Sequence, residues 1–509
     1  MLVKKKGDYS DDSKTDFVKW FSELNKNSGS VAGGKGANLA EIYNLKINVP
    51  PGFVVTAQAY DYFIKKSKIA DRIKLLLEKI DYENTEQLDN ITSEIRALIE
   101  GASFDEPLKE ELIEAYETLG ADDSDLDVLD RNSELPFVAV RSSATTEDLA
   151  EASFAGQQDT FLNVKGESQL IEKIKKCFAS LFTQRATYYR NKKGFKHEQA
   201  SLAVVVQRMI NSDKSGVIFS KNPSTKSDNV VIEAVFGLGE GIVSGRISPD
   251  NYVVSRDFEI EEKKIGVKKI AITRNDEGNT EIVKLKYEKS KQQVLSEYEI
   301  KFLSQIAVNL EEHYKKPQDI EFAIENKEIY IVQTRPITTL EHRVDAEQGF
   351  DVKGEVVLTG IAASPGIGSG KIKLVHSLDD LKKVSKGDVL VTKMTNPDMV
   401  VTMQRCSAIV TDEGGLTAHA SIVSREMGIP AVVGTQFATE KLKEGEIITV
   451  NGYNGKIYKG KISESVKKEV HPVKAETKTK LKLIVDLPSF AERASRTGLK
   501  DVGLLRVEG

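Results

Sequence analysis

Cysteine is scarce in this sequence, and long apolar runs are missing. Only two cysteines occur among 509 residues, Cys177 and Cys406, and they lie in no metal-ligand spacing. We therefore expect buried thiols in a reducing compartment, without disulfides or a cysteine-bound metal. No run approaches the ~20 apolar residues of a membrane-spanning helix, and no apolar signal core follows the N-terminus. These absences predict a cytoplasmic protein without a membrane partner.

The sequence also lacks an excess of charge of either sign. Lys and Arg total 72 against 77 Asp and Glu, which gives a formal net charge of -5. Such a balance offers no general attraction to nucleic acid or to an anionic membrane. Any phosphate group must therefore be bound by particular side chains. Internal repeats and low-complexity tracts are absent as well, and the composition is that of a folded globular protein.

The length and patterning predict several domains, because 509 residues exceed what one hydrophobic core usually holds. The predicted parts are an α+β region at 1–336, a polar linker at 337–353, a compact β/α domain at 354–460, a lysine-rich tether at 461–480, and a strand-helix-strand unit at 481–509. The last unit is typical of the start of a (β/α)8 barrel, which needs ~250 residues. Most of such a barrel is missing from the sequence.

Periodicity places several elements within these parts. Apolar residues at helical spacing predict amphipathic helices, and apolar runs between turn residues predict strands. We expect helices at 57–81, 106–119 and 419–427, and strands at 137–140, 202–208, 230–234 and 328–333.

Two segments have the composition of a phosphate clamp. Gly33-Gly34-Lys35-Gly36 leads into a helical stretch, where backbone N–H groups, the helix N-terminus and Lys35 can approach phosphate oxygens. Arg141 ends an apolar strand beside Ser142 and Ser143, and its guanidinium fork matches phosphate geometry. The alternatives are an ordinary glycine turn before a helix and a surface arginine in a polar turn.

A polar tetrad is predicted on a hairpin near residue 330. Asp319 and Glu321 share one face of a strand, and Gln333 and Arg335 share one face of the following strand. Two carboxylates on a rigid face suit Mg²⁺ when ATP phosphates and water supply its other ligands. Arg335 can then stabilise the transferred charge. The alternative is an ordinary cross-strand pair between Glu321 and Arg335.

Four further residues are candidates for binding the nucleoside of ATP. They follow or end apolar strands, where backbone groups could take adenine and a nearby acid could bond ribose hydroxyls. The alternative interpretation is a core strand followed by a glycine loop. These residues are Gln207, Met209, Glu233 and Glu240.

The sequence around His419 predicts a phosphoryl acceptor. Gly414 and Gly415 form a turn that delivers His419 to a helix start, where N–H groups and Thr417 can stabilise an added phosphoryl group. Arg425 lies near enough to assist. An unperturbed imidazole is largely neutral and nucleophilic near neutral pH. A lone histidine is usually structural, but the glycine turn and polar neighbours favour the catalytic interpretation.

Taken in order, these segments resemble the phosphoenolpyruvate synthase (pyruvate, water dikinase) family over nearly the whole chain. The stretches that carry the resemblance are GGKGANLAEI, VAVRSSATTEDLAEASFAGQQDTFLNV, QRMINSDKSGVIFS, QDIEFAIENKEIYIVQTRP and GGLTAHASIVSREMGIPAVVGT. The resemblance implies an ATP-grasp-like nucleotide-binding domain, a swivelling β/α phosphohistidine domain, and a barrel for pyruvate or phosphoenolpyruvate.

The resemblance also implies roles for individual residues. Lys35 and Arg141 become ligands of the ATP phosphates, the tetrad binds Mg-ATP, and His419 carries the phosphoryl group. In the family, ATP pyrophosphorylates the histidine with release of AMP, water removes one phosphate, and the remaining phosphoryl group passes to enolpyruvate. Arg506 matches a contact to the phosphoenolpyruvate phosphate, but the catalytic residues of later barrel strands are absent. We therefore expect this chain alone to perform the ATP half-reaction.

Other readings remain open at the level of sequence. Pyruvate, phosphate dikinase and antibiotic phosphotransferases belong to the same superfamily, and a non-catalytic nucleotide-sensing phosphorelay module could keep the ATP site and the histidine. The missing barrel could be supplied by a separate polypeptide, and the chain could form a homo-oligomer.

Overall fold

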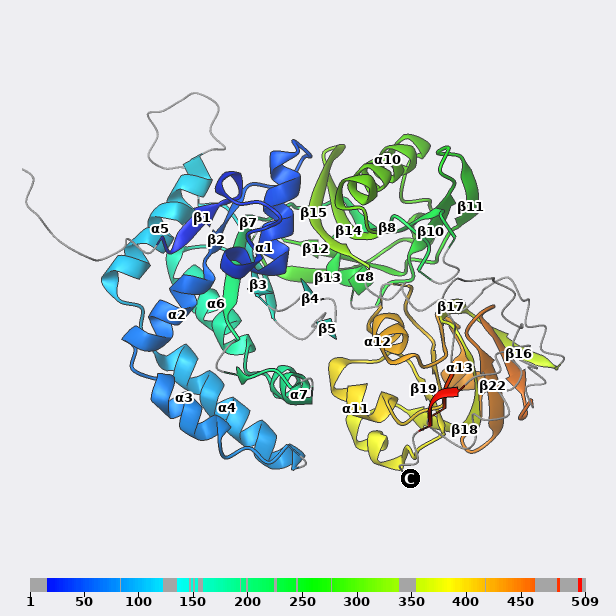
Figure 1. Ribbon diagram of the computed structural model, residues 1–509. Helices are drawn as coiled ribbons and strands as arrows, with labels where there is room; N and C mark the ends of the chain where they lie inside the picture. The colour runs from blue at the N-terminus through cyan, green and yellow to red at the C-terminus, as the bar shows by residue number, and fades with distance from the viewer. Residues whose placement is uncertain are drawn as a thin grey trace, which may run out of the picture. The chain divides into compact units, whose positions relative to one another are not determined.

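The structure is a computed structural model, shown in Figure 1. It describes residues 16–82, 84–121, 135–145, 148–149, 152–153, 159–192, 194–197, 200–223, 227–243, 246–275, 277–337, 354–416, 418–462, 483–485 and 502–505. The chain forms two compact units, Met1–Lys461 and Ile462–Gly509.

The first sheet of the larger unit is antiparallel and has helices on both faces. Phe53, Val140 and Val206 point to a core beneath a group of helices, while Val54 and Val205 point to the opposite face, against α1. Its strand order is β1 (Val18–Trp20), β2 (Gly52–Val55), β7 (Leu202–Arg208), β3 (Val138–Ala144) and β6 (Thr160–Val164). The helices around it are α1 (Gly29–Asn44), α2 (Ala57–Lys66), α3 (Ala70–Leu77), α4 (Thr85–Gly101), α5 (Glu106–Ala121), α6 (Glu167–Ser180) and α7 (Gln184–Lys192).

The second sheet is also antiparallel, and its two faces differ in character. Ile232, Ile320 and Phe322 pack against α10 (Glu297–Tyr314), whereas the alternate residues face the other way and include the predicted acids. The strand order is β11 (Ile260–Lys264), β10 (Asp250–Val254), β9 (Val230–Phe236), β8 (Lys214–Phe219), β14 (Gln318–Glu325) and β15 (Glu328–Pro336). A hairpin of β12 (Ile270–Arg274) and β13 (Thr280–Lys284) and the short helices α8 (Glu240–Val243) and α9 (Tyr287–Ser290) complete this part.

The third sheet carries the helix that begins at His419. Its four central strands run parallel, and it is covered by α12 (His419–Met427) on one face and α13 (Ala438–Lys441) on the other. The strand order is β16 (Val356–Thr359), β23 (Lys456–Lys459), β22 (Ile447–Asn451), β18 (Ile367–Val375), β19 (Val389–Thr392), β20 (Ala408–Thr411), β21 (Ala431–Val433) and β17 (Ile361–Ser364). A short helix, α11 (Val400–Met403), precedes β20.

In the smaller unit, the structure describes two short parallel strands, β24 (Leu483–Val485) and β25 (Val502–Leu505). The helix expected between them, the 461–480 tether beyond Ile462, and the linker beyond Ile337 lie outside the described residues. None of the helices within the described ranges is both long and apolar enough to cross a membrane.

Most predicted elements are present, but one is wrong. Strand 202–208 and helix 419–427 have the predicted bounds, and the mixed α/β character is confirmed. The helix expected at 57–81 is instead two helices, α2 and α3. Lys68 adopts a φ of 58° just after α2, and this left-handed conformation ends the helix. Periodicity continues across such a break, so the sequence pattern did not reveal it.

Candidate active site

The glycine turn and the strand end of Arg141 meet directly. Gly33 has a φ of 64°, and a Cβ there would lie 2.2 Å from the carbonyl oxygen of Ser143. The Ser143 hydroxyl donates to the Ala32 carbonyl (2.8 Å) and accepts from the Gly36 N–H (3.1 Å). Lys35 Nζ donates to the Ser142 carbonyl (3.0 Å). Two segments separated by about a hundred residues therefore form one continuous surface, which only glycine at position 33 permits.

Arg141 connects this surface to the second sheet. Its Nη1 donates to the Val332 carbonyl (3.0 Å), and its Nη2 donates to Glu321 (3.2 Å) and to Gln333. The side chain is 12% exposed, and its buried Nε has no partner among the described residues. A buried N–H without an acceptor is costly, and an anionic ligand would satisfy it.

The predicted hairpin has the predicted faces, in a register that the sequence did not specify. Asp319 lies opposite Arg335, and Glu321 lies opposite Gln333, with a bulge after Glu321. Arg335 donates from Nε and Nη2 to Asp319 Oδ2 (2.9 and 2.8 Å). The alternative pairing of Glu321 with Arg335 is wrong, because Glu321 bonds Arg141 instead.

The remaining nucleotide candidates are spread over both sheets. Glu233 lies in the same cross-strand row as Val217 and Glu321, so it shares their face of the sheet, and it is 0% exposed. Gln207 is buried on the Arg141 face of the first sheet, with Nε2 donating to the Pro50 carbonyl (3.3 Å). The Met209 N–H donates to the Phe137 carbonyl, and the Met209 side chain packs against the apolar cluster beside Glu233. Glu240 is exposed at the start of α8.

His419 is the first residue of α12, and its imidazole is largely buried. Thr395 Oγ1 lies 2.9 Å from Nδ1. Burial, and then the positive charge of Arg185, lower the pKa of His419 to about 4. The imidazole is therefore neutral near pH 7. Neither Thr395 nor Arg185 was predicted, since each lies in a distant segment without a pattern that indicates contact with His419.

The turn before His419 is held by its own helix. Gly414 has a φ of 109°, which favours glycine. Arg425 donates to the carbonyls of Leu416 (2.7 Å) and Ala363 (3.0 Å), and Ser421 donates to that of Gly415 (2.6 Å). Thr417 and Arg506, two other predicted site residues, lie outside the described residues.

The part of the larger unit that carries the third sheet contacts the second sheet at this turn. The Leu416 N–H donates to Glu233 Oε1 (2.8 Å), and the Leu416 side chain joins an apolar cluster on the second sheet. The histidine turn is thus in contact with the face of the sheet that carries Glu321 and Gln333.

A magnesium ion would find two carboxylates here, with no complete cage. Asp319 and Glu321 project from one strand face and are 14% and 29% exposed. In the described part of the chain, no group of three or more His, Cys, Asp or Glu side chains is arranged so that it could hold a metal ion. Mg²⁺ commonly binds through one or two carboxylates plus phosphates and water, so this donor set fits Mg²⁺ only together with a nucleotide.

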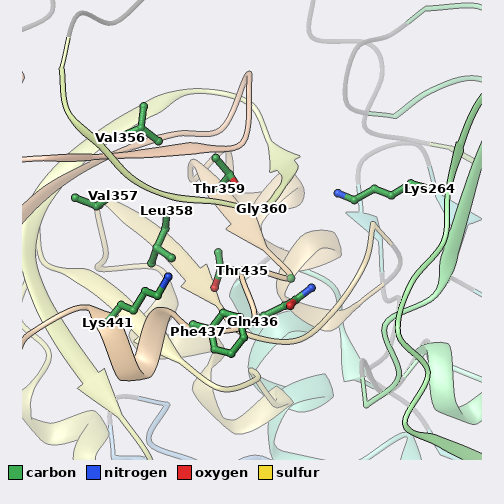
Figure 2. Close-up of a pocket in the computed structure, with 11 residues that line it drawn as sticks. Lys264, Val356, Val357, Leu358, Thr359, Gly360, Thr435, Gln436, Phe437 and Lys441 are labelled. Atoms are coloured by element: carbon green, nitrogen blue, oxygen red, sulfur yellow. The ribbon is translucent and has the colours of Figure 1, made fainter. Parts of the chain in front are cut away.

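A separate pocket of about 450 Å³ contains none of the predicted residues (Figure 2). Lys264 approaches it from β11, opposite Thr359 and Lys441 of the third-sheet domain. Its remaining lining comes from residues 356–360 and 434–437.

Comparisons with known proteins match two parts of the chain. Residues 29–353 match the family described as pyruvate phosphate dikinase, AMP/ATP-binding domain. Residues 384–455 match the PEP-utilising enzyme, mobile domain. The first match covers the sheets with Arg141 and the hairpin, and the second covers His419.

Full-length relatives agree with these matches. The chain is 50% identical to a probable phosphoenolpyruvate synthase of Archaeoglobus fulgidus, covering 96% of this chain and 65% of the relative. It is 44% identical to the phosphoenolpyruvate synthase of Pyrococcus furiosus (97% and 66%). A probable phosphoenolpyruvate synthase of Methanothermobacter thermautotrophicus is 43% identical (98% and 72%). The chain thus spans about two thirds of the length of these curated relatives.

Proposed function

Because this chain belongs to the phosphoenolpyruvate synthase family, we propose that it transfers phosphoryl groups from ATP to its own His419. The observation that carries the proposal is the position of Arg141, which contacts the hairpin residues Glu321 and Gln333 while its strand packs on the Lys35 turn. Three separate segments thereby supply cations and acids to one site, as a polyphosphate requires.

Each cation has a defined task in this proposal. Lys35, Arg141 and Arg335 bind the phosphate chain, and Gln207, Met209 and Glu240 contribute to the nucleoside side. Glu233, the fourth nucleoside candidate, accepts the Leu416 N–H instead. Asp319 and Glu321 hold Mg²⁺, which neutralises charge on the phosphates when it is bound. Arg335 and Arg141 now pair with those two carboxylates. Binding of Mg-ATP therefore exchanges arginine–carboxylate pairs for arginine–phosphate contacts.

His419 acts as the nucleophile through the nitrogen that Thr395 leaves available. If Nδ1–H donates to Thr395 Oγ1, the lone pair lies on Nε2. Nε2 attacks the β-phosphorus, a P–N bond forms, and the bond to the bridging oxygen breaks so that AMP leaves with that oxygen. Water then releases the terminal phosphate. A pKa of about 4 keeps the lone pair unprotonated at neutral pH.

The acceptor is pyruvate in this proposal, and its use requires a complete barrel. With such a barrel, the phosphoryl group passes from Nε2 to the enolate oxygen of pyruvate and gives phosphoenolpyruvate. A separate barrel polypeptide would provide it. We propose a cytoplasmic setting, which suits two reduced, buried cysteines.

The test is to incubate the chain with Mg²⁺ and ATP labelled at the β-phosphate. We expect acid-labile, base-stable label on the wild type with release of AMP, and no label on His419→Ala. His376→Ala, at an exposed histidine of the same domain, is the matched control and should be labelled normally. An unlabelled wild-type chain would refute the proposal.

A second experiment identifies the acceptor. When a barrel polypeptide is supplied, pyruvate should discharge the labelled protein and yield labelled phosphoenolpyruvate. Discharge that is indifferent to pyruvate would favour a phosphorelay instead.

A further inference from the structure

Glu233 is buried where the domain of the third sheet meets the second sheet. It is 0% exposed, and its Oε1 accepts the Leu416 N–H at 2.8 Å. Leu416 lies three positions before His419 and 183 positions after Glu233 along the chain. A buried donor or acceptor that loses its partner is costly, so this contact matters for how the domains associate.

The side chain of Leu416 adds an apolar contact beside that bond. Leu416 is 5% exposed and fills a socket on the site face of the second sheet. The buried residues of the socket are Val217, Phe219, Val231, Val235, Leu238, Ile242, Ile247 and Ile272. The turn therefore docks through both a carboxyl acceptor and a hydrophobic recess.

Gly415 shows how closely the carboxylate approaches the turn. A Cβ at Gly415 would lie 2.6 Å from Glu233 Oε1 and 2.9 Å from Oε2. Gly415 is not among the residues with positive φ, unlike its neighbour Gly414. Its backbone would therefore accept alanine, and the obstacle is Glu233 itself.

The docked turn is linked rigidly to the histidine. Arg425 and Ser421, both on α12, bond the carbonyls of Leu416 and Gly415. A shift of the turn therefore moves the start of α12, and His419 with it.

We propose that Glu233 and the Leu416 socket form the docking site that seats the histidine turn on the ATP-binding domain. Glu233 is then a positioning residue for phosphoryl transfer, and its carboxylate serves the turn rather than the ribose while the domains are docked. The proposal rests on the proposed function for its purpose, but the docking can be measured without ATP.

The first measurement is hydrogen exchange of the full chain over residues 414–418, without nucleotide. Glu233→Ala removes the acceptor and should accelerate exchange about tenfold or more. Leu416→Ala should accelerate exchange at the neighbouring amides and lower the rate of His419 labelling. Leu442→Ala is the control, because Leu442 is equally buried but packs inside the third-sheet domain.

A double-mutant cycle tests the contact itself. Gly415→Ala should slow His419 labelling strongly, and Glu233→Asp, which withdraws the carboxylate by one methylene, should restore part of the rate in the double variant. Additive losses would show that the two residues do not meet in the reacting molecule.

ATP affinity separates the two roles of Glu233. The docking role predicts that Glu233→Ala binds ATP within about twofold of wild type while labelling falls at least about tenfold. Weaker ATP binding with unchanged exchange at 414–418 would overturn the docking role and favour a ribose contact. If the wild type is not labelled by ATP, the proposed function fails, whereas the exchange result still decides the docking.

Discussion

At the scale of single residues, the protonation of His419 controls the proposed chemistry. Its imidazole is enclosed beside Thr395 and is influenced by Arg185, and both burial and the nearby cation disfavour the charged form. A phosphoryl acceptor of this kind is ready to react without a general base.

The pH dependence of labelling follows from that state. Since the pKa of His419 is lowered to about 4, the labelling rate should stay level from neutral pH down to about pH 5 and fall below it. An ordinary histidine would already lose activity near pH 6.5. The measurement is the initial rate of label transfer from pH 4 to 8 with ATP saturating at each pH, and a midpoint near 6.5 would contradict the prediction.

The same shift has a consequence for stability. The unfolded chain has the higher pKa, so it binds more protons than the folded chain between pH 6.5 and about 4. The contribution of His419 to the free energy of unfolding is therefore fully present above pH 6.5 and is lost as the pH falls through that window. His419→Ala should remove this part of the pH dependence in urea unfolding.

Arg141 illustrates a residue whose shape matters as much as its charge. Its guanidinium contacts Val332, Glu321 and Gln333 together, which a single ammonium group cannot reproduce. Arg141→Lys should lower ATP affinity by at least about tenfold. The control is Arg256→Lys, which should leave ATP affinity unchanged. Arg256 lies beside the second sheet and bonds Glu311 and the Ser220 carbonyl. Equal effects of the two substitutions would show that Arg141 has no special part.

At the scale of elements, the kink in α1 shapes the phosphate surface. Gly33 combines a φ of 64° with a close approach to the Ser143 carbonyl. The first turn of α1 and the end of β3 therefore constrain each other.

Gly33→Ala should weaken both stability and ATP binding, because a Cβ meets a backbone atom that cannot move aside. Gly166→Ala is the matched control, since Gly166 has a φ of 90° but nothing within 4 Å of the added Cβ. Backbone strain alone should cost about 1–3 kcal/mol at either site, because both glycines combine a positive φ with an extended ψ. Gly33→Ala should exceed that cost in urea unfolding and also reduce ATP affinity, and identical behaviour of the two variants would refute the contact.

At the scale of the whole molecule, the reactivity of each of the two cysteines measures the opening of a different domain. Cys177 lies in α6 against the first sheet, and Cys406 packs in the third-sheet domain. Burial raises the pKa of both thiols, that of Cys406 to about 12, so neither should react with a thiol reagent until its surroundings open.

Mg-ATP should therefore protect one thiol and not the other. At a concentration 100 times its Kd, a ligand stabilises its domain by about 2.7 kcal/mol, which slows the reaction of Cys177 with the thiol reagent about a hundredfold when opening is a rapid pre-equilibrium. Cys406 should react at an unchanged rate. Reaction of the Cys177→Ser and Cys406→Ser variants with the thiol reagent shows which cysteine reacts at which rate. Equal protection of both thiols would mean that the domains open together.

The sequence by itself determined the local features of this protein. Alternation in the hairpin placed Asp319 and Glu321 on one face, and the glycine turn with an amphipathic run placed His419 at a helix start, since these patterns depend only on neighbouring residues. Motif order was also enough to indicate the family. The break between α2 and α3 was missed because one left-handed residue does not disturb the apolar period.

Only the tertiary structure decided which distant groups meet. The bonds from Arg141 to the hairpin, from Thr395 to His419, and from Glu233 to Leu416 join segments 191, 24 and 183 positions apart. No periodicity connects such positions. They are brought together because buried donors and acceptors must be satisfied once the sheets have packed, and packing is a property of the whole chain.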